Sequence, residues 1–296
     1  MLDLHVHTRF SDGTDTVEEL LINAENKNLE IISITDHDTI QAYNYLEKED
    51  IRNFFSGRII VGVEMKAYYN GVPVEVLGYG IDYNKIKLHK TAVYMMQIKF
   101  LEEFKKIGRK IGLIFDENIS VSKTDPSRKF ASVVFATELI KYKENENRLL
   151  SIGPRFDANS FYRVHSSNKN SIFYVDESEG GIPLNQAIDE IHNAGGLAFL
   201  AHPLVYPFDN KNKFEEIEEI LKNYDLDGLE CEYPLFSNDE REHLKKIAIK
   251  YNKYIIGGTD YHAKNKPNIQ IGTGINENLN IEKELIENWL DKVKLI

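Results

Sequence analysis

Short apolar segments rich in β-branched residues alternate with segments of helical periodicity, and few folds accommodate this pattern over a whole chain. The expected strands are residues 2–6, 31–34, 59–63, 72–79, 197–200, 228–231 and 254–256. Apolar residues recur at helical spacing in residues 16–28, 185–194 and 237–251. Thr14 or Asp15 can cap the first of these helices, and Gly195-Gly196 ends the second. Strands that alternate with helices are typical of a parallel sheet or barrel, so the predicted class is α/β.

One long segment, residues 82–181, interrupts the alternation. Residues 91–110 and 131–143 have helical patterns, and the Asn- and Ser-rich residues 145–171 are predicted to be irregular. We therefore predict one domain formed by residues 1–81 and 182–296, and an inserted, mainly helical subdomain over residues 82–181 that caps the substrate. A chain of 296 residues, of which 42% are hydrophobic, is long enough to build the core of such a domain.

Cysteine content and hydropathy narrow the class of protein. The single cysteine, Cys231, excludes an intramolecular disulfide and a cysteine-rich zinc site. Apolar runs stay well short of the roughly 20 residues that a membrane span needs. The first expected strand begins at Leu2, without the basic and apolar segments of a signal peptide. We expect a cytoplasmic protein with no membrane partner.

Charge is distributed unevenly along the chain. The net charge of −11 argues against broad, non-specific binding to nucleic acid, which needs clustered Lys and Arg. Residues 99–170, in contrast, hold more Lys and Arg than Asp and Glu. An acidic body with a basic middle segment suits a cation site that faces an anionic substrate. Any one of these basic residues can equally belong to a solvated helix surface.

His, Asp and Glu side chains cluster at or just beyond the C-terminal ends of the expected strands. Five of the nine histidines lie there, and His5 and His7 project from the same face of the first strand. The other residues of these clusters are Asp12, His37, Glu64, His202, Asp260 and His262. Active sites of barrels and open α/β sheets gather at this edge.

Each of these residues also has an ordinary structural interpretation when it is taken alone. A single histidine after a strand can be a core or surface residue, Asp12 before Gly13 suits a turn, and Glu64 suits an exposed strand end. Their occurrence together at five strand ends favours a metal centre. Imidazole and carboxylate ligands without thiolate suit Zn, Mn or Fe. The number of ligands exceeds the need of one tetrahedral ion, so we expect two or more ions that share carboxylates.

The clusters form motifs that resemble those of the PHP (polymerase and histidinol phosphatase) family, in particular its stand-alone phosphoesterases. The motifs are His5-Val6-His7-Thr8, Ser11-Asp12-Gly13, Thr35-Asp36-His37-Asp38, Gly62-Val63-Glu64, Leu77-Gly78-Tyr79, Ala201-His202-Pro203 and Gly258-Thr259-Asp260-Tyr261-His262. This resemblance implies a distorted (β/α)7 barrel of PHP type with two or three divalent metal ions. It covers the barrel portion, and the inserted segment only weakly.

The resemblance also implies which residues hold each ion. The first ion would be held by His5, His7, Glu64 and Asp260. Glu64 would bridge to a second ion, which position 75 and His202 complete. The third ion would be held by Asp12, His37 and His262.

The chain departs from the relatives' pattern at two places. Position 75 is Glu where relatives have His. As a harder ligand, Glu75 would favour Mn or Fe at the second site or leave that site weakly bound, and as a plain polar strand residue it would bind nothing. Relatives commonly carry an Arg-x-His element in the inserted segment, and here the nearest stretch, Arg128-Lys129-Phe130, lacks that histidine.

The predicted activity is a metal-dependent phosphoesterase. Its substrates would be nucleotides, short single-stranded RNA or related small phosphates, which a metal-bound hydroxide attacks at phosphorus. Three alternatives stay open: a cyclic-phosphate phosphodiesterase, a phosphatase of sugar or histidinol phosphates, and a non-catalytic metal-binding module.

Several side chains have predicted roles beside metal binding. Asp260 or His262 would transfer the proton in catalysis. The residues expected to contact the substrate phosphate are Arg128, Arg155 and Arg163. Asp36 and Asp38 would orient His37.

Overall fold

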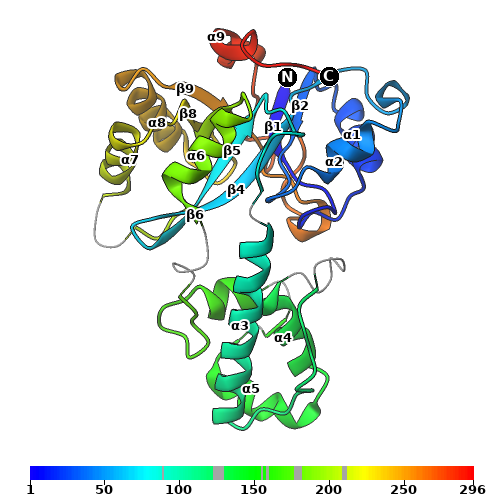
Figure 1. Ribbon diagram of the computed structural model, residues 1–296, viewed down its shortest axis with the longest axis vertical. Helices are drawn as coiled ribbons and strands as arrows, with labels where there is room; N and C mark the ends of the chain where they lie inside the picture. The colour runs from blue at the N-terminus through cyan, green and yellow to red at the C-terminus, as the bar shows by residue number, and fades with distance from the viewer. Residues whose placement is uncertain (89, 123–129, 155, 158–159, 177–181, 209–211) are drawn as a thin grey trace. The chain divides into compact units, whose positions relative to one another are not determined.

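The computed structural model describes residues 1–88, 90–122, 130–154, 156–157, 160–176, 182–208 and 212–296 (Figure 1). The chain divides into two compact units. The first is formed by Met1–Leu88 and Ile182–Ile296, and the second by His89–Gly181. Strands and helices alternate in the first unit, whereas the described part of the second is helical (Figure 1).

The strands of the first unit form two sheets. In chain order they are β1 (Leu2–Val6), β2 (Ile31–Ile34), β3 (Arg58–Ile59), β4 (Gly62–Tyr69), β5 (Val72–Tyr79), β6 (Ile182–Pro183), β7 (Leu197–Leu200), β8 (Gly228–Glu232) and β9 (Tyr254–Gly257). A parallel sheet has the order β1-β2-β3, and a mixed sheet has the order β6-β4-β5-β7-β8-β9, in which β5 is antiparallel to both neighbours. The predicted α/β class is confirmed, but the larger sheet is mixed rather than purely parallel.

Isolated bridges connect the two sheets at their polar edge. Val6 bridges to Tyr261 and His37 bridges to Glu64, both in parallel orientation. The backbone N–H of Asp260 also donates to the carbonyl of His5 at 2.7 Å. These contacts bring the ends of β1, β2, β4 and β9 together, which is where the metal centre is expected.

The region around residue 60 differs from the sequence prediction. The expected single strand over residues 59–63 is wrong, because β3 ends at Ile59 and β4 begins at Gly62. β4 then continues to Tyr69 and turns back into β5 through Asn70 and Gly71, with φ of 49° and 78°. Asn-Gly between two strands is the strongest short signal for a hairpin, because both positions tolerate positive φ. Glu64 therefore lies within a long hairpin strand and not at a strand end.

Amphipathic helices cover the sheets of the first unit. They are α1 (Val17–Asn26), α2 (Gln41–Leu46), α6 (Leu184–Asn193), α7 (Lys213–Asn223), α8 (Asn238–Lys250) and α9 (Glu287–Leu290). α1 begins with a capping box between Thr16 and Glu19, so the expectation that Thr14 or Asp15 caps this helix is wrong. Gly195, with φ of 81°, follows α6 as predicted. Figure 1 shows α6, α7 and α8 beside the six-stranded sheet.

The second unit has its own hydrophobic core. Its helices are α3 (Lys90–Lys110), α4 (Ala131–Leu139) and α5 (Glu146–Ile152), followed by a π-helix over Tyr162–Ser166. Phe104, Phe135, Phe161 and Phe173 pack together at the centre of this core. The prediction of irregular structure over residues 145–171 is wrong for α5 and for the π-helix. Among the described helices of the chain, none has the length and apolar character needed to cross a membrane.

Candidate metal centre

The strands of the first unit carry a buried group of His, Asp and Glu side chains to one edge. His5 belongs to β1 and His7 follows it, and both side chains are fully buried. Alternation along β1 gives both imidazoles the same direction, toward the carboxylate of Asp260 beyond β9. The Oδ1 atom of Asp260 lies 3.4 Å from Nε2 of His7 and 3.7 Å from Nε2 of His5. These three side chains can hold one ion.

Glu64 occupies the middle of this group. Its Oε2 atom lies 3.3 Å from Nε2 of His5, 3.2 Å from Nε2 of His7 and 3.2 Å from Nδ1 of His37. Its Oε1 atom lies 3.2 Å from Nε2 of His202, which follows β7. Both oxygens of this carboxylate therefore face imidazoles that different elements carry.

A third cluster surrounds Asp12 in the loop after β1. Its Oδ1 atom lies 3.1 Å from Nε2 of His262 and 3.6 Å from Nδ1 of His7, and its Oδ2 atom lies 3.6 Å from Nε2 of His37. His262 in turn contacts the backbone carbonyl of Asp260 through Nδ1 at 2.8 Å. If Nδ1 carries the proton of the neutral imidazole, Nε2 is free to face Asp12.

Glu75 joins the centre from β5. It is the register partner of Lys66 on β4, so Glu75 and Glu64 project from the same face of the hairpin. One Glu75 oxygen lies 3.5 Å from Nδ1 of His37 and the other 3.4 Å from Nε2 of His202. Burial and the nearby charge of Glu64 raise the pKa of Glu75 to about 7. Its carboxylate thus lies within reach of His37 and His202, so Glu75 can be a metal ligand.

Several buried polar atoms of the centre have no hydrogen-bond partner among the described residues. They are Nε2 of His5, Nε2 of His7, Nδ1 of His37, Oδ1 of Asp12 and Oε2 of Glu64. Each such atom costs about 1–3 kcal/mol if it remains unsatisfied. The unsatisfied atoms are imidazole nitrogens and carboxylate oxygens that face one another, a donor set that fits Zn, Mn or Fe. The residues present therefore fit divalent cations.

Electrostatics at the centre lead to the same conclusion. Burial lowers the pKa of His7, but the nearby carboxylates of Asp260 and Glu64 outweigh it and raise the pKa to about 10. Burial raises the pKa of Glu64, and the surrounding imidazoles outweigh that effect and hold this pKa well below its usual range. The carboxylates thus attract protons onto His5, His7 and His202 when no metal is bound, whereas burial lowers the pKa of His37 to about 3. A divalent cation would displace those protons, so metal binding must weaken as the pH falls.

All nine predicted metal ligands come together in this region. They are His5, His7, Asp12, His37, Glu64, Glu75, His202, Asp260 and His262. The predicted orientation of His37 by Asp36 is not what the structure has. Asp36 instead accepts hydrogen bonds from Thr8 and Ser11 at 2.5–2.8 Å, and it fixes the loop between His7 and Asp12. Asp38 accepts from the backbone N–H of Lys66 at 3.3 Å.

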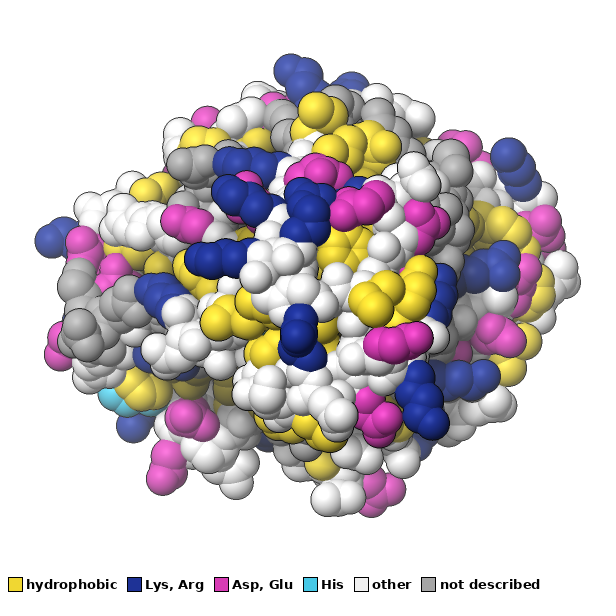
Figure 2. Space-filling model, turned by 90° about the horizontal axis from the view of Figure 1, so that it is seen from below, with side chains coloured by type: hydrophobic (Ala, Val, Ile, Leu, Met, Phe, Trp, Pro, Cys, Tyr) yellow, Lys and Arg dark blue, Asp and Glu magenta, His cyan; other side chains and the backbone are white. Residues whose placement is uncertain are grey.

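The arginines predicted to contact phosphate remain predictions. Arg128 and Arg155 lie outside the described residues, and Arg163 lies in the π-helix of the second unit with a side chain that is not described. Figure 2 shows one face of the molecule on which Lys and Arg side chains are interspersed with Asp, Glu and hydrophobic side chains. A mixed surface of this kind attracts a long polyanion less than a continuous basic patch does.

Three residues that contact candidate ligands were not predicted from the sequence. Glu230 on β8 accepts from Nδ1 of His5, and Tyr233 and Lys266 both contact Oδ2 of Asp260, at 2.8 and 2.5 Å. Glu230 had a usable signal, because it is a charged residue inside an otherwise apolar strand segment. Lys266 and Tyr233 had none, since their positions depend on loops after β9 and β8.

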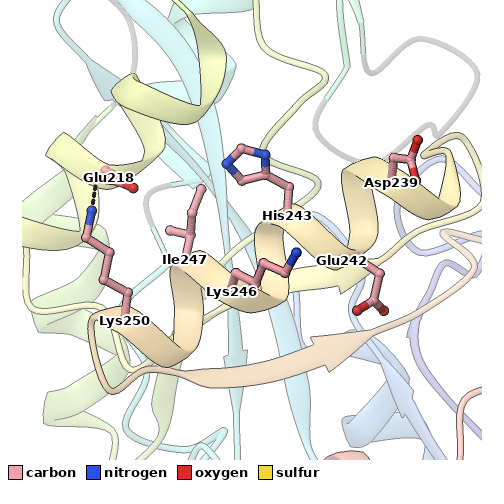
Figure 3. A pocket seen from close by; sticks show the side chains of 7 residues that line it. All are labelled: Glu218, Asp239, Glu242, His243, Lys246, Ile247 and Lys250. Atoms are coloured by element: carbon pink, nitrogen blue, oxygen red, sulfur yellow. Dashed lines mark hydrogen bonds and ion pairs between the residues drawn. The ribbon is translucent and has the colours of Figure 1, made fainter.

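A separate hollow lies on the outer side of the first unit. It has a volume of about 420 Å³ and is lined by α7 and α8. Figure 3 shows Asp239, Glu242, His243 and Lys246 along α8, with Lys250 paired to Glu218 of α7. Acidic and basic side chains alternate there, and none of the nine candidate ligands lines it. The metal centre is therefore the stronger candidate for the functional site.

Curated relatives match most of the chain at low identity. A phosphoribosyl 1,2-cyclic phosphate 1,2-diphosphodiesterase of Eggerthella lenta is 24% identical, and the match covers 88% of this chain and 94% of the relative. A 5'-3' exoribonuclease of Haemophilus influenzae is 28% identical, and the match covers 88% of this chain and 89% of the relative. A 3',5'-nucleoside bisphosphate phosphatase of Chromobacterium violaceum is 23% identical, with 92% and 90% covered.

Solved structures share the fold. A Bifidobacterium adolescentis protein, proposed to be a metal-dependent phosphoesterase, matches with a TM-score of 0.67 and 21% identity over 99% of this chain and 96% of that one. An amidohydrolase from Chromobacterium violaceum, with bound sulfate and no metal, matches with a TM-score of 0.65 and 22% identity. This match covers 96% of this chain and 95% of the amidohydrolase. The PHP domain model matches residues 3–260, which is well over half of the sequence, and the chain therefore belongs to the PHP domain family.

Proposed function

We propose that this chain is a metal-dependent phosphoesterase that hydrolyses small phosphate esters at the centre around Glu64. The observation that carries the proposal is the convergence of nine His, Asp and Glu side chains, several of which have buried polar atoms without a hydrogen-bond partner in the described part of the chain. Relatives named as a diphosphodiesterase, an exoribonuclease and a bisphosphate phosphatase support the same bond type. The shared chemistry is attack of water on phosphorus.

The geometry supports an assignment of ligands to two or three ions. His5, His7, Glu64 and Asp260 would hold the first ion, and Glu64, Glu75 and His202 the second. Asp12, His37 and His262 would hold the third. When bound, Mn, Fe or Zn ions in such a site neutralise phosphoryl oxygens and lower the pKa of water.

Two of these residues would also touch the reacting atoms. The Oδ2 atom of Asp260 accepts from the hydroxyl of Tyr233 at 2.8 Å and lies 2.5 Å from Nζ of Lys266, so only Oδ1 faces the centre. Nδ1 of His262 is occupied by the carbonyl of Asp260, which leaves Nε2 directed at Asp12. We propose that Asp260 or His262 orients the attacking water and accepts its proton through this atom, Oδ1 or Nε2, when that atom does not hold an ion.

The architecture of the family supports two further parts of the proposal. The first unit would be an open, distorted form of the PHP barrel, because isolated bridges link its two sheets. Residues 82–181 would be an inserted subdomain that caps the substrate, with Arg128, Arg155 and Arg163 contacting phosphate.

Replacing Arg163 with Ala should then raise KM, by a factor that reflects about 1–3 kcal/mol for a charge-assisted contact. Lys110→Ala in α3 is the matched control, and equal KM values for both variants would remove Arg163 from substrate binding.

One experiment tests the activity and its substrate class. The purified protein is analysed for bound elements and assayed with mononucleotides, 3',5'-bisphosphates, cyclic phosphates and short single-stranded RNA. Hydrolysis of at least one class that a chelator abolishes and Mn, Fe or Zn restores is the expected result. Metal binding without hydrolysis of any class would assign the chain to the non-catalytic alternative.

Cyclic phosphates are the second candidate substrates. The Eggerthella lenta diphosphodiesterase is matched over 94% of its length, so no large part of that enzyme is missing from the comparison. A cyclic phosphate opened faster than any 5'-phosphorylated RNA or nucleoside bisphosphate would favour this activity over the other two. The reverse order of rates would favour a nucleotide or short RNA as the substrate.

A further inference from the structure

Strand β8 carries a fully buried carboxylate, Glu230, which is not one of the nine candidate ligands. Its Oε1 atom lies 3.0 Å from Nδ1 of His5. Its Oε2 atom accepts the backbone N–H of His202 at 2.7 Å. One side chain therefore connects two of the elements that bring imidazoles to the metal centre, β1 and the loop after β7.

We propose that Glu230 is a positioning residue that orients His5 and His202 toward the two oxygens of Glu64, and so toward the first and the second metal ion. The inference rests on the proposed function, because it takes His5 and His202 as ligands. The donor atoms of both imidazoles lie close to those of Glu64. Glu230 contacts Nδ1 of His5 and the backbone N–H of His202, whereas Glu64 faces Nε2 of the His5 ring.

At His5 the contact selects which ring nitrogen is free. A neutral imidazole has one N–H, and donation from Nδ1 to Glu230 leaves the lone pair on Nε2. Nε2 is the atom that faces the centre, at 3.3 Å from Oε2 of Glu64 and 3.7 Å from Oδ1 of Asp260. A carboxylate on the second nitrogen of a ligating histidine fixes its tautomer and increases its basicity.

At His202 the contact acts on the backbone. His202 has φ of 20°, at the edge of the left-handed region that residues other than glycine rarely adopt. Such a conformation persists only where surrounding contacts determine it. The hydrogen bond from its N–H to Glu230 is one of these contacts, and it holds Nε2 of His202 at 3.2 Å from Oε1 of Glu64. Without Glu230, both the peptide and the imidazole lose this constraint.

The test compares Glu230→Gln with Glu232→Gln. Glutamine keeps the shape of Glu230, but its amide N–H₂ would face one of the two donors, so one contact must be lost. Glu232 lies on the same strand and pairs instead with Lys245 at 2.6 Å. In chelator competition, Glu230→Gln should bind at least one ion about 10–100-fold more weakly than wild type, as is typical for loss of such a partner. Glu232→Gln should retain wild-type affinity.

The tautomer gives a second measurement that needs no substitution. In the zinc-loaded wild-type protein, ¹⁵N NMR should find the His5 proton on Nδ1 and the metal on Nε2, whether or not Glu230→Gln folds. Equal metal affinity of wild type and Glu230→Gln, or a proton on Nε2 of His5, overturns the inference alone. A wild-type protein that binds no divalent metal overturns the proposed function, and the role of Glu230 with it.

Discussion

The metal centre of the first unit and the core of the second unit differ in what fills their interiors. The centre gathers His5, His7, Glu64 and their neighbours, with polar atoms left unpaired in the described part of the chain. The core of the second unit is filled by packed phenylalanines such as Phe104 and Phe135, whose ring centroids are 5.7 Å apart. The buried polar groups of the metal centre oppose folding unless a cation binds there, whereas the apolar core of the second unit stabilises the fold by itself.

Two buried histidines, His165 and His7, show the same difference between the two interiors. His165 in the second unit contacts the carbonyl of Pro154 through Nε2 at 3.0 Å and stacks on Phe156 at 4.2 Å. Burial lowers its pKa, as expected for a neutral core imidazole. His7 instead faces carboxylates, and its Nε2 lacks a hydrogen bond to the described residues. Burial alone therefore does not identify a functional histidine, and the partners of both ring nitrogens do.

The most drastic change is the replacement of His5 and His7 with Ala. At least one metal ion per chain and essentially all hydrolysis should be lost, because both imidazoles face the same carboxylates. The fold should persist, since two buried polar groups are removed together with their unfavourable burial. Elemental analysis and circular dichroism check both statements, with His165→Ala as the control that keeps its metal. Wild-type metal content in the double variant would contradict the ligand assignment.

Replacement of Phe135 with Ala should produce the opposite pattern. Loss of a fully buried phenylalanine costs about 3–5 kcal/mol of unfolding free energy, because a cavity remains among the other rings. Denaturant unfolding of the metal-loaded protein measures this loss. Metal content should equal that of the wild type. A Phe135→Ala protein that loses metal in proportion to its stability would show that the two interiors are not independent.

Lys266 tests whether the centre depends on charge beyond its ligands. Burial raises the pKa of Asp260, but Lys266 and the nearby imidazoles outweigh it and hold this pKa well below its usual range. Lys266→Met removes a charge-assisted contact, and we expect about a tenfold loss of metal affinity, at the low end of the 1.5–3 kcal/mol typical of such bonds. Lys264→Met, which changes an exposed lysine two positions away, should have no effect. Equal metal affinities of Lys266→Met and wild type would mean that Tyr233 alone is sufficient to orient Asp260.

The smallest effect concerns the metal-free protein and pH. The pKa of Glu75 is raised to about 7, so the folded state binds a proton here between about pH 4.5 and 7 that the unfolded state has released. Stability therefore falls as the pH rises through this window. Glu75→Gln should be more stable than wild type at pH 8, on the order of 1–3 kcal/mol, and equal to it at pH 5. Thermal unfolding in chelator measures the difference. A constant difference at both pH values would mean that Glu75 does not titrate.

Much of this centre could be predicted from the sequence because its ligands follow strands. His5 and His7 share a face through strand periodicity, and Asp260 and His262 follow the last strand, so all approach one edge. Glu230 was not predicted because ligands were expected at strand ends, whereas Glu230 lies within β8. Lys266 depends on the path of a loop, which periodicity does not specify.

The fold could be predicted to a similar degree, and the incorrect predictions have physical reasons. Alternation of strands and helices indicated the α/β class, but it also suggested a purely parallel sheet. The antiparallel placement of β5 depends on the turn at Asn70 and Gly71, a signal that hydropathy alone does not reveal. The π-helix over Tyr162–Ser166 has no simple periodic signature, because it is polar and short.

The same turn has a consequence for the evolution of the family. Glu64 and Glu75 are held on one face of the hairpin by backbone pairing that begins at Tyr69 and Val72. Adding or deleting one residue in β5 between this turn and Glu75 would shift the register by one and direct Glu75 away from the other ligands. The side chain at position 75 can therefore be replaced without a change of register, whereas the number of residues between the turn and position 75 is fixed by the strand pairing.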